Sequence, residues 1–271
     1  VVRKMTIQIY LVFMLTFIIY LIGTLAYSTR IVGIRTGRIA VSFAVFNVFV
    51  LIQRTANTIQ APLLAKTIEN GINTGNSGNL LYIFRWIIFS ITLATIAGAV
   101  LMPTFIKVFD KLVTSFSAYR SLPKLMIHAF SKSGIEQFRN SISIPKRENL
   151  SELRNFRKIP KKVILLNVIA FSISSVSVLS SLYAGCLSPN LRTTCSTLAS
   201  VVNSVSTIFM VIFIDPYLSM MTDDVIKGEC TELEFNRCII FIVAGLIVGS
   251  ILAQFILVSA SNLIVIIAKL I

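Results

Sequence analysis

Residues 27–69 read YSTRIVGIRTGRIAVSFAVFNVFVLIQRTANTIQAPLLAKTIE, and this stretch decides the fold. Its first part holds three arginines, Arg30, Arg35 and Arg38. An apolar run begins at Ile39, is interrupted by polar residues that include Arg54, and is expected to end at Pro62. In a chain this hydrophobic, the run predicts a membrane-spanning helix with an arginine inside it. A charge in hydrocarbon is costly, so we expect Arg54 to face a cavity, a partner or a substrate.

The composition predicts that the whole chain lies in a bilayer. Hydrophobic residues make up 55% of the sequence and charged residues only 13%, whereas a soluble domain carries about 25% charged residues. The formal net charge is +14, and the basic residues are concentrated between the apolar runs. This pattern favours anionic membrane lipids or an anionic lipid substrate as partners. Nucleic acid is not expected, because no nucleic-acid motif accompanies the basic residues.

Six apolar runs are long enough to cross a hydrocarbon core about 30 Å thick, which takes about 20 helical residues. Their approximate ranges are 5–26, 39–61, 80–102, 163–183, 195–214 and 239–268. The fourth run is rich in serine, which favours close helix packing in lipid. The sixth carries Gly245 and Gly249 at a spacing that also favours close packing. We expect the fifth run to stop at Asp215-Pro216.

The runs divide the chain into three units within one all-α integral membrane protein. Residues 1–102 and 163–271 each hold three spans, and residues 103–162 form a polar, basic segment between them. From Phe105 to Tyr119, apolar residues recur three or four positions apart. This period is typical of an amphipathic helix lying in the membrane interface.

The distribution of lysine and arginine predicts the orientation of the spans. Thirteen of the 25 basic residues lie in the segment 103–162, which the positive-inside rule places in the cytoplasm. Both termini are then expected outside. In this orientation the cytoplasmic side holds 18 basic residues and the outer side six, although Arg3 and Lys4 count against it.

A weak internal repeat relates the two three-span units. Residues 25–47 align without gaps on residues 181–203, which pairs Asn47 with Asn203. Because each unit holds three spans, the two would enter the membrane from opposite sides, as in the inverted repeats of transporters. Substrate sites of such proteins lie at the interface between repeats. We therefore expect Asn47 and Asn203 to take part in substrate binding.

Arg54 has two possible roles. It could form a structural ion pair with Asp215 or Glu69, or it could bind an anion, because a guanidinium suits phosphate oxygens. Arg38 and Arg54 would lie about 24 Å apart on one helix, at about 1.5 Å per residue. They would give a phosphate that crosses the membrane two successive binding positions. The three arginines before Ile39 could equally be topological anchors. The candidate substrate-binding residues are Arg30, Arg35, Arg38, Arg54, Asn57, Gln60, Asn47, Asn203 and Asp215.

The sequence shows no motif of a nucleotide, cofactor or metal site. Walker, GxSxG and HExxH patterns are absent, so we expect no cofactor, no resident metal and no catalytic residue. The four cysteines lack metal-ligand spacing. Cys186 and Cys195 share one short loop, where they could pair or stay free.

Besides a transporter, two functional classes remain open. The first is an integral membrane enzyme that acts on polyprenyl phosphates and holds Mg²⁺ with Asp215, Asp223 and Asp224. The second is a membrane scaffold that docks partners through residues 103–162.

Two stretches resemble one protein family over nearly the whole chain. Residues 26–69 and the run LYAGCLSPNLRTTCSTLASVVN at 182–203, continuing to FIDPYLSMMTDDV at 213–225, are similar to the Amj family, the alternate bacterial lipid II flippases. The resemblance implies a plasma-membrane transporter, not an enzyme. It implies movement of undecaprenyl-pyrophosphoryl disaccharide-pentapeptide from the inner to the outer leaflet for peptidoglycan synthesis. It assigns no transport residue.

These observations combine into one expected mechanism. Arg30, Arg35 and Arg38 collect the pyrophosphate at the inner leaflet. Arg54, with Asn57 and Gln60, then receives it in a water-filled cavity, and the two halves rock by alternating access.

Overall fold

The computed structural model describes residues 2–73, 80–119 and 161–271, and every regular element in these ranges is helical. The elements are α1 (Val2–Thr36), α2 (Ile39–Asn73), α3 (Leu80–Tyr119), α7 (Lys161–Leu187), η4 (Pro189–Leu191), α8 (Arg192–Phe209), the π-helical η5 (Met210–Ile214), α9 (Asp215–Lys227) and α10 (Glu232–Leu270). Within the described ranges, six helical stretches are long and apolar enough to cross a membrane. The all-α class and the six spans are therefore confirmed.

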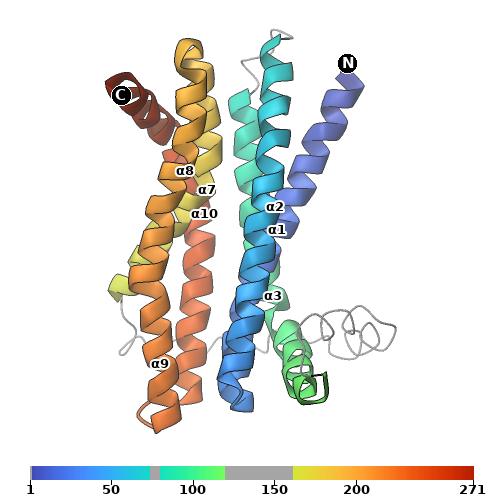
Figure 1. The fold of residues 1–271 in the computed structure, drawn as a ribbon, viewed down its shortest axis with the longest axis vertical. Coiled ribbons are helices and arrows are strands. Elements are labelled where there is room, and N and C mark those ends of the chain that lie inside the picture. The colour runs from blue at the N-terminus through green and yellow to red at the C-terminus, as the bar shows by residue number, and fades with distance from the viewer. Residues whose placement is uncertain (1, 74–79, 120–160) are drawn as a thin grey trace.

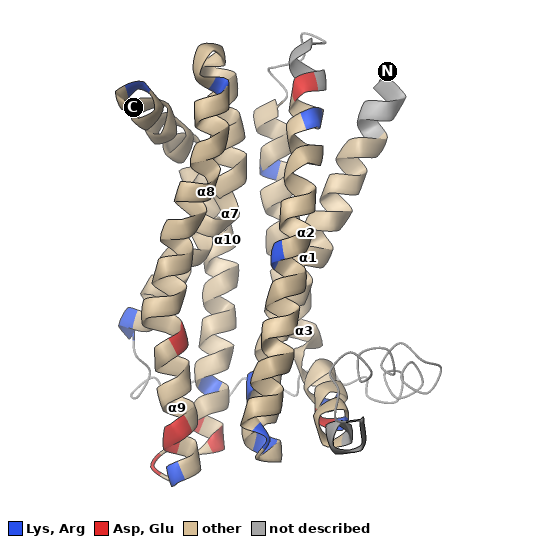
Figure 2. Ribbon diagram, viewed as in Figure 1, with Lys and Arg blue, Asp and Glu red and all other residues tan. Residues whose placement is uncertain are grey.

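The helices form two groups of three spans (Figure 1). In the first group α1 packs against both α2 and α3, and in the second α7 packs against both α8 and α10. The groups meet mainly through α3 and α10, whereas α2 and α8 stand in front with a separation between them. Both termini lie at one end of the bundle, and the α1–α2 and α9–α10 turns lie at the other, here called the turn end. Figure 2 shows most of the described acidic residues at the turn end.

Three predicted helix ends are wrong, because proline does not stop these helices. α2 continues through Pro62, α3 continues through Pro103, and the fifth span continues through η5 and Pro216 into α9. A proline inside a helix removes one backbone hydrogen bond and favours a kink. In a bundle of spanning helices, neighbouring groups and local π geometry can satisfy the freed carbonyls, so the helix goes on.

The expected interfacial helix at 105–119 is the continuation of α3. Phe109 is buried in a cluster with Val32 of α1, and its ring centroid lies 5.2 Å from that of Phe49 in α2. The apolar face of this part of α3 therefore packs against the protein itself. Residues 120–160, which make up most of the expected basic loop, lie outside the described residues.

Close packing of α7 on α10 depends on the glycines that the sequence singled out. A Cβ on Gly249 would lie 2.8 Å from the carbonyl oxygen of Val168, and one on Gly245 would lie 2.6 Å from Asn167 Nδ2. Asn167 Nδ2 also donates a hydrogen bond to the Ile242 carbonyl across this interface, at 2.8 Å. The two helices can approach this closely only without side chains at both positions.

We expect Gly249→Leu to lower the thermal unfolding midpoint in detergent. The new side chain meets a backbone carbonyl that cannot rotate away, and overpacking of this kind costs about 1–3 kcal/mol. Val248→Leu is the matched control, because Val248 is 53% exposed on the same helix. An unchanged midpoint for Gly249→Leu would contradict the packing described here.

Candidate functional site

A polar cavity of about 440 Å³ lies between the two helix groups. Its polar lining residues are Thr16 and Tyr20 from α1, Arg54, Asn57, Thr58 and Gln60 from α2, Ser174, Ser175 and Ser177 from α7, and Ser200, Asn203 and Thr207 from α8. A second cavity of about 170 Å³ shares Arg54, Asn57 and Asn203 with the first and extends to Asp215. The two cavities are adjacent, and polar side chains from several helices line them in a bundle that exposes many large hydrophobic side chains.

Arg54 faces both cavities from the centre of the span Ile39–Glu69. The span is longer than the sequence predicted, and Arg54 is its central residue. Its side chain has no ion-pair partner among the described residues. Asp215 is paired with another arginine, and Glu69 lies 4.0 Å from Arg192. The structural ion pair considered for Arg54 is therefore not formed.

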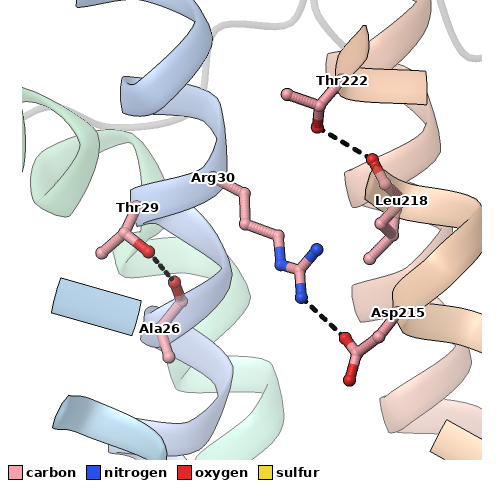
Figure 3. A network of polar contacts seen from close by, with 6 residues as sticks. All are labelled: Ala26, Thr29, Arg30, Asp215, Leu218 and Thr222. Atoms are coloured by element: carbon pink, nitrogen blue, oxygen red, sulfur yellow. Dashed lines mark hydrogen bonds and ion pairs between the residues drawn. The ribbon is translucent and has the colours of Figure 1, made fainter. Parts of the chain in front are cut away.

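Arg30 is the arginine that pairs with Asp215. α1 continues to Thr36, so Arg30 lies in a helix and not in a loop. Its Nη2 atom is 2.6 Å from Asp215 Oδ1, and the two side chains are 5% and 42% exposed (Figure 3). The guanidinium also stacks on Phe46 at 4.5 Å and Phe43 at 5.3 Å from the ring centroids. These contacts join α1, α2 and α9.

The Arg30–Asp215 pair stands between two separate spaces. Asp215 lines the 170 Å³ cavity, whereas Arg30 lines another cavity of about 90 Å³ with Ser42, Thr222 and other residues nearer the turn end. Arg30 Nε and Ser42 Oγ are buried without a hydrogen-bond partner. The ion pair therefore joins a residue that lines the 170 Å³ cavity to a residue that lines the 90 Å³ cavity.

Arg35 and Arg38 have partners of their own. Arg35 forms an exposed ion pair with Glu232 at 3.2 Å. Arg38 Nη1 donates to the carbonyl oxygens of Val113 and Thr114, at 3.0 and 2.9 Å, which ties the α1–α2 turn to α3. The structure does not gather the three arginines around one site, and these contacts fit the anchoring role that the sequence left open.

The predicted polar residues divide into two groups. Gln60 is buried, and its Nε2 atom donates to Thr16 Oγ1 at the wall of the large cavity. Asn203 lines both cavities and accepts a hydrogen bond from Ser174 Oγ at 3.4 Å. Asn47, its partner in the internal repeat, is exposed and lines neither cavity. The structure thus brings Asn203 to the site but not Asn47.

The sequence does not predict the polar side chains that α7 contributes to the cavity. Its serines favour close helix packing, yet Ser174, Ser175 and Ser177 line the large cavity. Ser174 and Ser177 are three positions apart and so share a helix face. A polar face of this kind on an otherwise apolar span is the sequence signal that indicates the lining of a polar cavity.

The enzyme alternative assigns Mg²⁺ to Asp215, Asp223 and Asp224. Asp215 binds Arg30, and the described part of the chain has no group of three or more metal-ligating side chains. Cys186 and Cys195 are free thiols.

Two comparisons with known proteins point to the same family. The model of the Amj family, described as "Alternate to MurJ", matches residues 15–268. The chain is 33% identical over 256 residues to the Lipid II flippase Amj of Bacillus subtilis (strain 168), and the match covers 92% of each chain. No solved structure matches the chain. Because the match spans all six membrane helices, the chain belongs to the Amj family.

Proposed function

We propose that this protein is a lipid II flippase of the bacterial plasma membrane. It moves the undecaprenyl-pyrophosphate-linked disaccharide-pentapeptide from the inner to the outer leaflet for peptidoglycan synthesis. The observation that carries the proposal is Arg54, a cation without an ion-pair partner among the described residues, at the centre of a spanning helix and on the wall of a cavity with many polar side chains. The name of the Bacillus subtilis relative, a transporter and not an enzyme, supports the choice of substrate.

The chemistry of the cavity suits a pyrophosphate headgroup. A guanidinium gives phosphate oxygens two parallel hydrogen bonds, which are strong where water is scarce. A cavity of 440 Å³ falls within the usual range of about 300–1,000 Å³ for ligand sites. The pyrophosphate and its neighbouring groups occupy the polar space while the prenyl tail stays in lipid.

Alternating access works through the contact between the helix groups. Arg30 of the first group pairs with Asp215 of the second, and on this proposal the pair is the contact that closes the polar space toward the turn end. A pyrophosphate arriving there offers Arg30 a stronger anion and replaces Asp215, which lets the groups separate. The π-helical η5 and Pro216 give the fifth span a place to bend, since both interrupt the regular hydrogen-bond pattern.

The two groups act as inverted repeats on this proposal. In both groups the first helix packs on the other two, and α1 and α7 run in opposite directions. These features and the alignment of residues 25–47 with 181–203 support a pseudo-twofold relation. A rocking motion of one repeat against the other follows from such symmetry.

The transport step needs no nucleotide. An anion that leaves a negative cytoplasm gains about 2.3 kcal/mol per charge for each 100 mV of membrane potential. A pyrophosphate carries enough charge for the potential alone to drive export.

The direct test is reconstitution. Purified protein in vesicles is expected to speed the movement of labelled lipid II between leaflets, measured by the accessibility of its headgroup to an added membrane-impermeant reagent. Vesicles with heat-inactivated protein are the control. A rate no higher than that control would reject the proposed function.

The proposed orientation places the turn end in the cytoplasm and both termini outside. We expect Asn190→Cys, in the exposed turn between α7 and α8, to react in whole cells with a membrane-impermeant maleimide. Glu229→Cys, in the α9–α10 turn, should react only after permeabilisation. Cys230 is a poor reporter, because burial raises the pKa of its thiol and Glu234, which accepts its hydrogen bond, raises it further. The reverse labelling pattern would invert the topology.

A further inference from the structure

The large cavity has two chemically different walls. On one side α2 contributes Arg54, the one charged side chain among its described lining residues. On the other side, α7 and α8 contribute Ser174, Ser175, Ser177, Ser200, Asn203 and Thr207. We call this second set the α7–α8 wall. Arg54 and Asn203 line both cavities, so the two walls face a common space.

In this structure the hydroxyl groups of the α7–α8 wall donate hydrogen bonds within the protein. Ser175 donates to a carbonyl oxygen of α7 at 2.8 Å, and Ser200 and Thr207 donate to carbonyl oxygens of α8 at 2.8 and 3.0 Å. Ser174 donates to the amide oxygen of Asn203. A hydroxyl that donates to its own helix keeps its lone pairs as acceptors. Apart from the Asn203 NH₂ group, the wall therefore offers acceptors to a ligand.

This arrangement favours a sugar over a phosphate at the α7–α8 wall, because the wall's described lining residues carry no positive charge. Phosphate oxygens are acceptors and carry negative charge, so they match Arg54 and not a row of hydroxyl lone pairs. Sugar hydroxyls and acetamido N–H groups can donate hydrogen bonds to the wall. The carbonyl oxygen of an acetamido group can accept one from the Asn203 NH₂ group. In a lipid-linked disaccharide the sugar is bonded directly to the pyrophosphate. A pyrophosphate held at Arg54 therefore places its sugar in the same space.

We infer that the α7–α8 wall is a carbohydrate subsite, which binds the sugar adjacent to the pyrophosphate and makes the cavity selective for glycosylated polyprenyl pyrophosphates. This inference rests on the proposed function and adds its specificity. Arg54 recognises the charge that such lipids share, and the wall recognises the headgroup that distinguishes them.

The test compares two lipids on purified protein in detergent. One is a polyprenyl pyrophosphate that carries the disaccharide, and the other is the same polyprenyl pyrophosphate without sugar. The wild-type protein is expected to bind the glycosylated lipid about tenfold or more tightly, as the loss of several neutral hydrogen bonds predicts. The variant Ser200→Ala/Asn203→Leu/Thr207→Val should bind both lipids equally and keep its affinity for the sugar-free lipid. Thr197→Val is the matched control, because Thr197 is an exposed α8 residue outside the cavity lining.

Each outcome decides between the two proposals. If the wild-type protein binds neither lipid, the proposed function fails. If it binds both lipids equally, or if the triple variant keeps the wild-type preference or loses affinity for both, the carbohydrate subsite is wrong. The single variant Thr207→Val, which removes one hydroxyl at nearly constant volume, replaces the triple variant if the latter unfolds. It should reduce the preference several-fold.

Discussion

Arg54→Ala is expected to reduce lipid II flipping to the background rate while the protein still reaches the membrane in normal amounts. Two charge-assisted hydrogen bonds to a pyrophosphate are worth about 1.5–3 kcal/mol each, so their loss lowers the rate at least about a hundredfold. Folding should not suffer, because the Arg54 side chain is exposed to the cavity and has no ion-pair partner among the described residues. The measurement is headgroup accessibility in reconstituted vesicles and in cells that depend on this protein.

Two further variants make the Arg54 result specific. Arg54→Lys keeps the charge but loses the planar fork, so it should retain part of the activity. Arg85→Ala removes an exposed arginine from another spanning helix, one that lines neither cavity, and should leave flipping unchanged. Full flipping by Arg54→Ala at normal expression would reject the role assigned to Arg54 and, with it, the main support for the mechanism.

The sequence predicts the number of spans and the environment of Arg54 for the same physical reason. A bilayer leaves the backbone no hydrogen-bonding solvent, so an apolar run of about 20 residues must become a helix. It also makes an exposed charge in hydrocarbon costly, which required a cavity or a partner for Arg54. The structure provides the cavity.

The pairing of charges could not be predicted, because it depends on tertiary structure. Arg30 and Asp215 are 185 positions apart, and no sequence pattern favours Arg30 over Arg54 as the partner of Asp215. The predicted positions of the helix ends are wrong for a related reason. Local rules stop helices at proline, whereas packing in the bundle carries α2 past Pro62 and α3 past Pro103.

Asp215→Ala is expected to destabilise the protein more than removal of both charges does. The variant leaves the Arg30 guanidinium, only 5% exposed, without its partner. Breaking a fully buried pair costs about 3–5 kcal/mol, and the cost here should be lower because Asp215 is 42% exposed. Arg30→Met leaves Asp215, which is 42% exposed and can be solvated by water in the cavity, so its cost should be smaller. Arg30→Met/Asp215→Ala removes both charges and should recover most of the stability, since apolar replacement of a buried pair is often neutral. Thermal and denaturant unfolding in detergent measure all three.

In this series the double variant should recover stability without recovering transport. This difference distinguishes a contact that closes the cavity during transport from a contact that only stabilises the fold. If pyrophosphate replaces Asp215 at Arg30, the double variant is stable but flips slowly, because the arginine that receives the substrate is gone. A purely structural pair would instead let transport recover together with stability. Arg35→Ala is the control, since its exposed pair with Glu232 should contribute about 0–1 kcal/mol. Unchanged stability of Asp215→Ala would mean that the pair does not hold the resting state, and the cavity would then need another contact to close it toward the turn end.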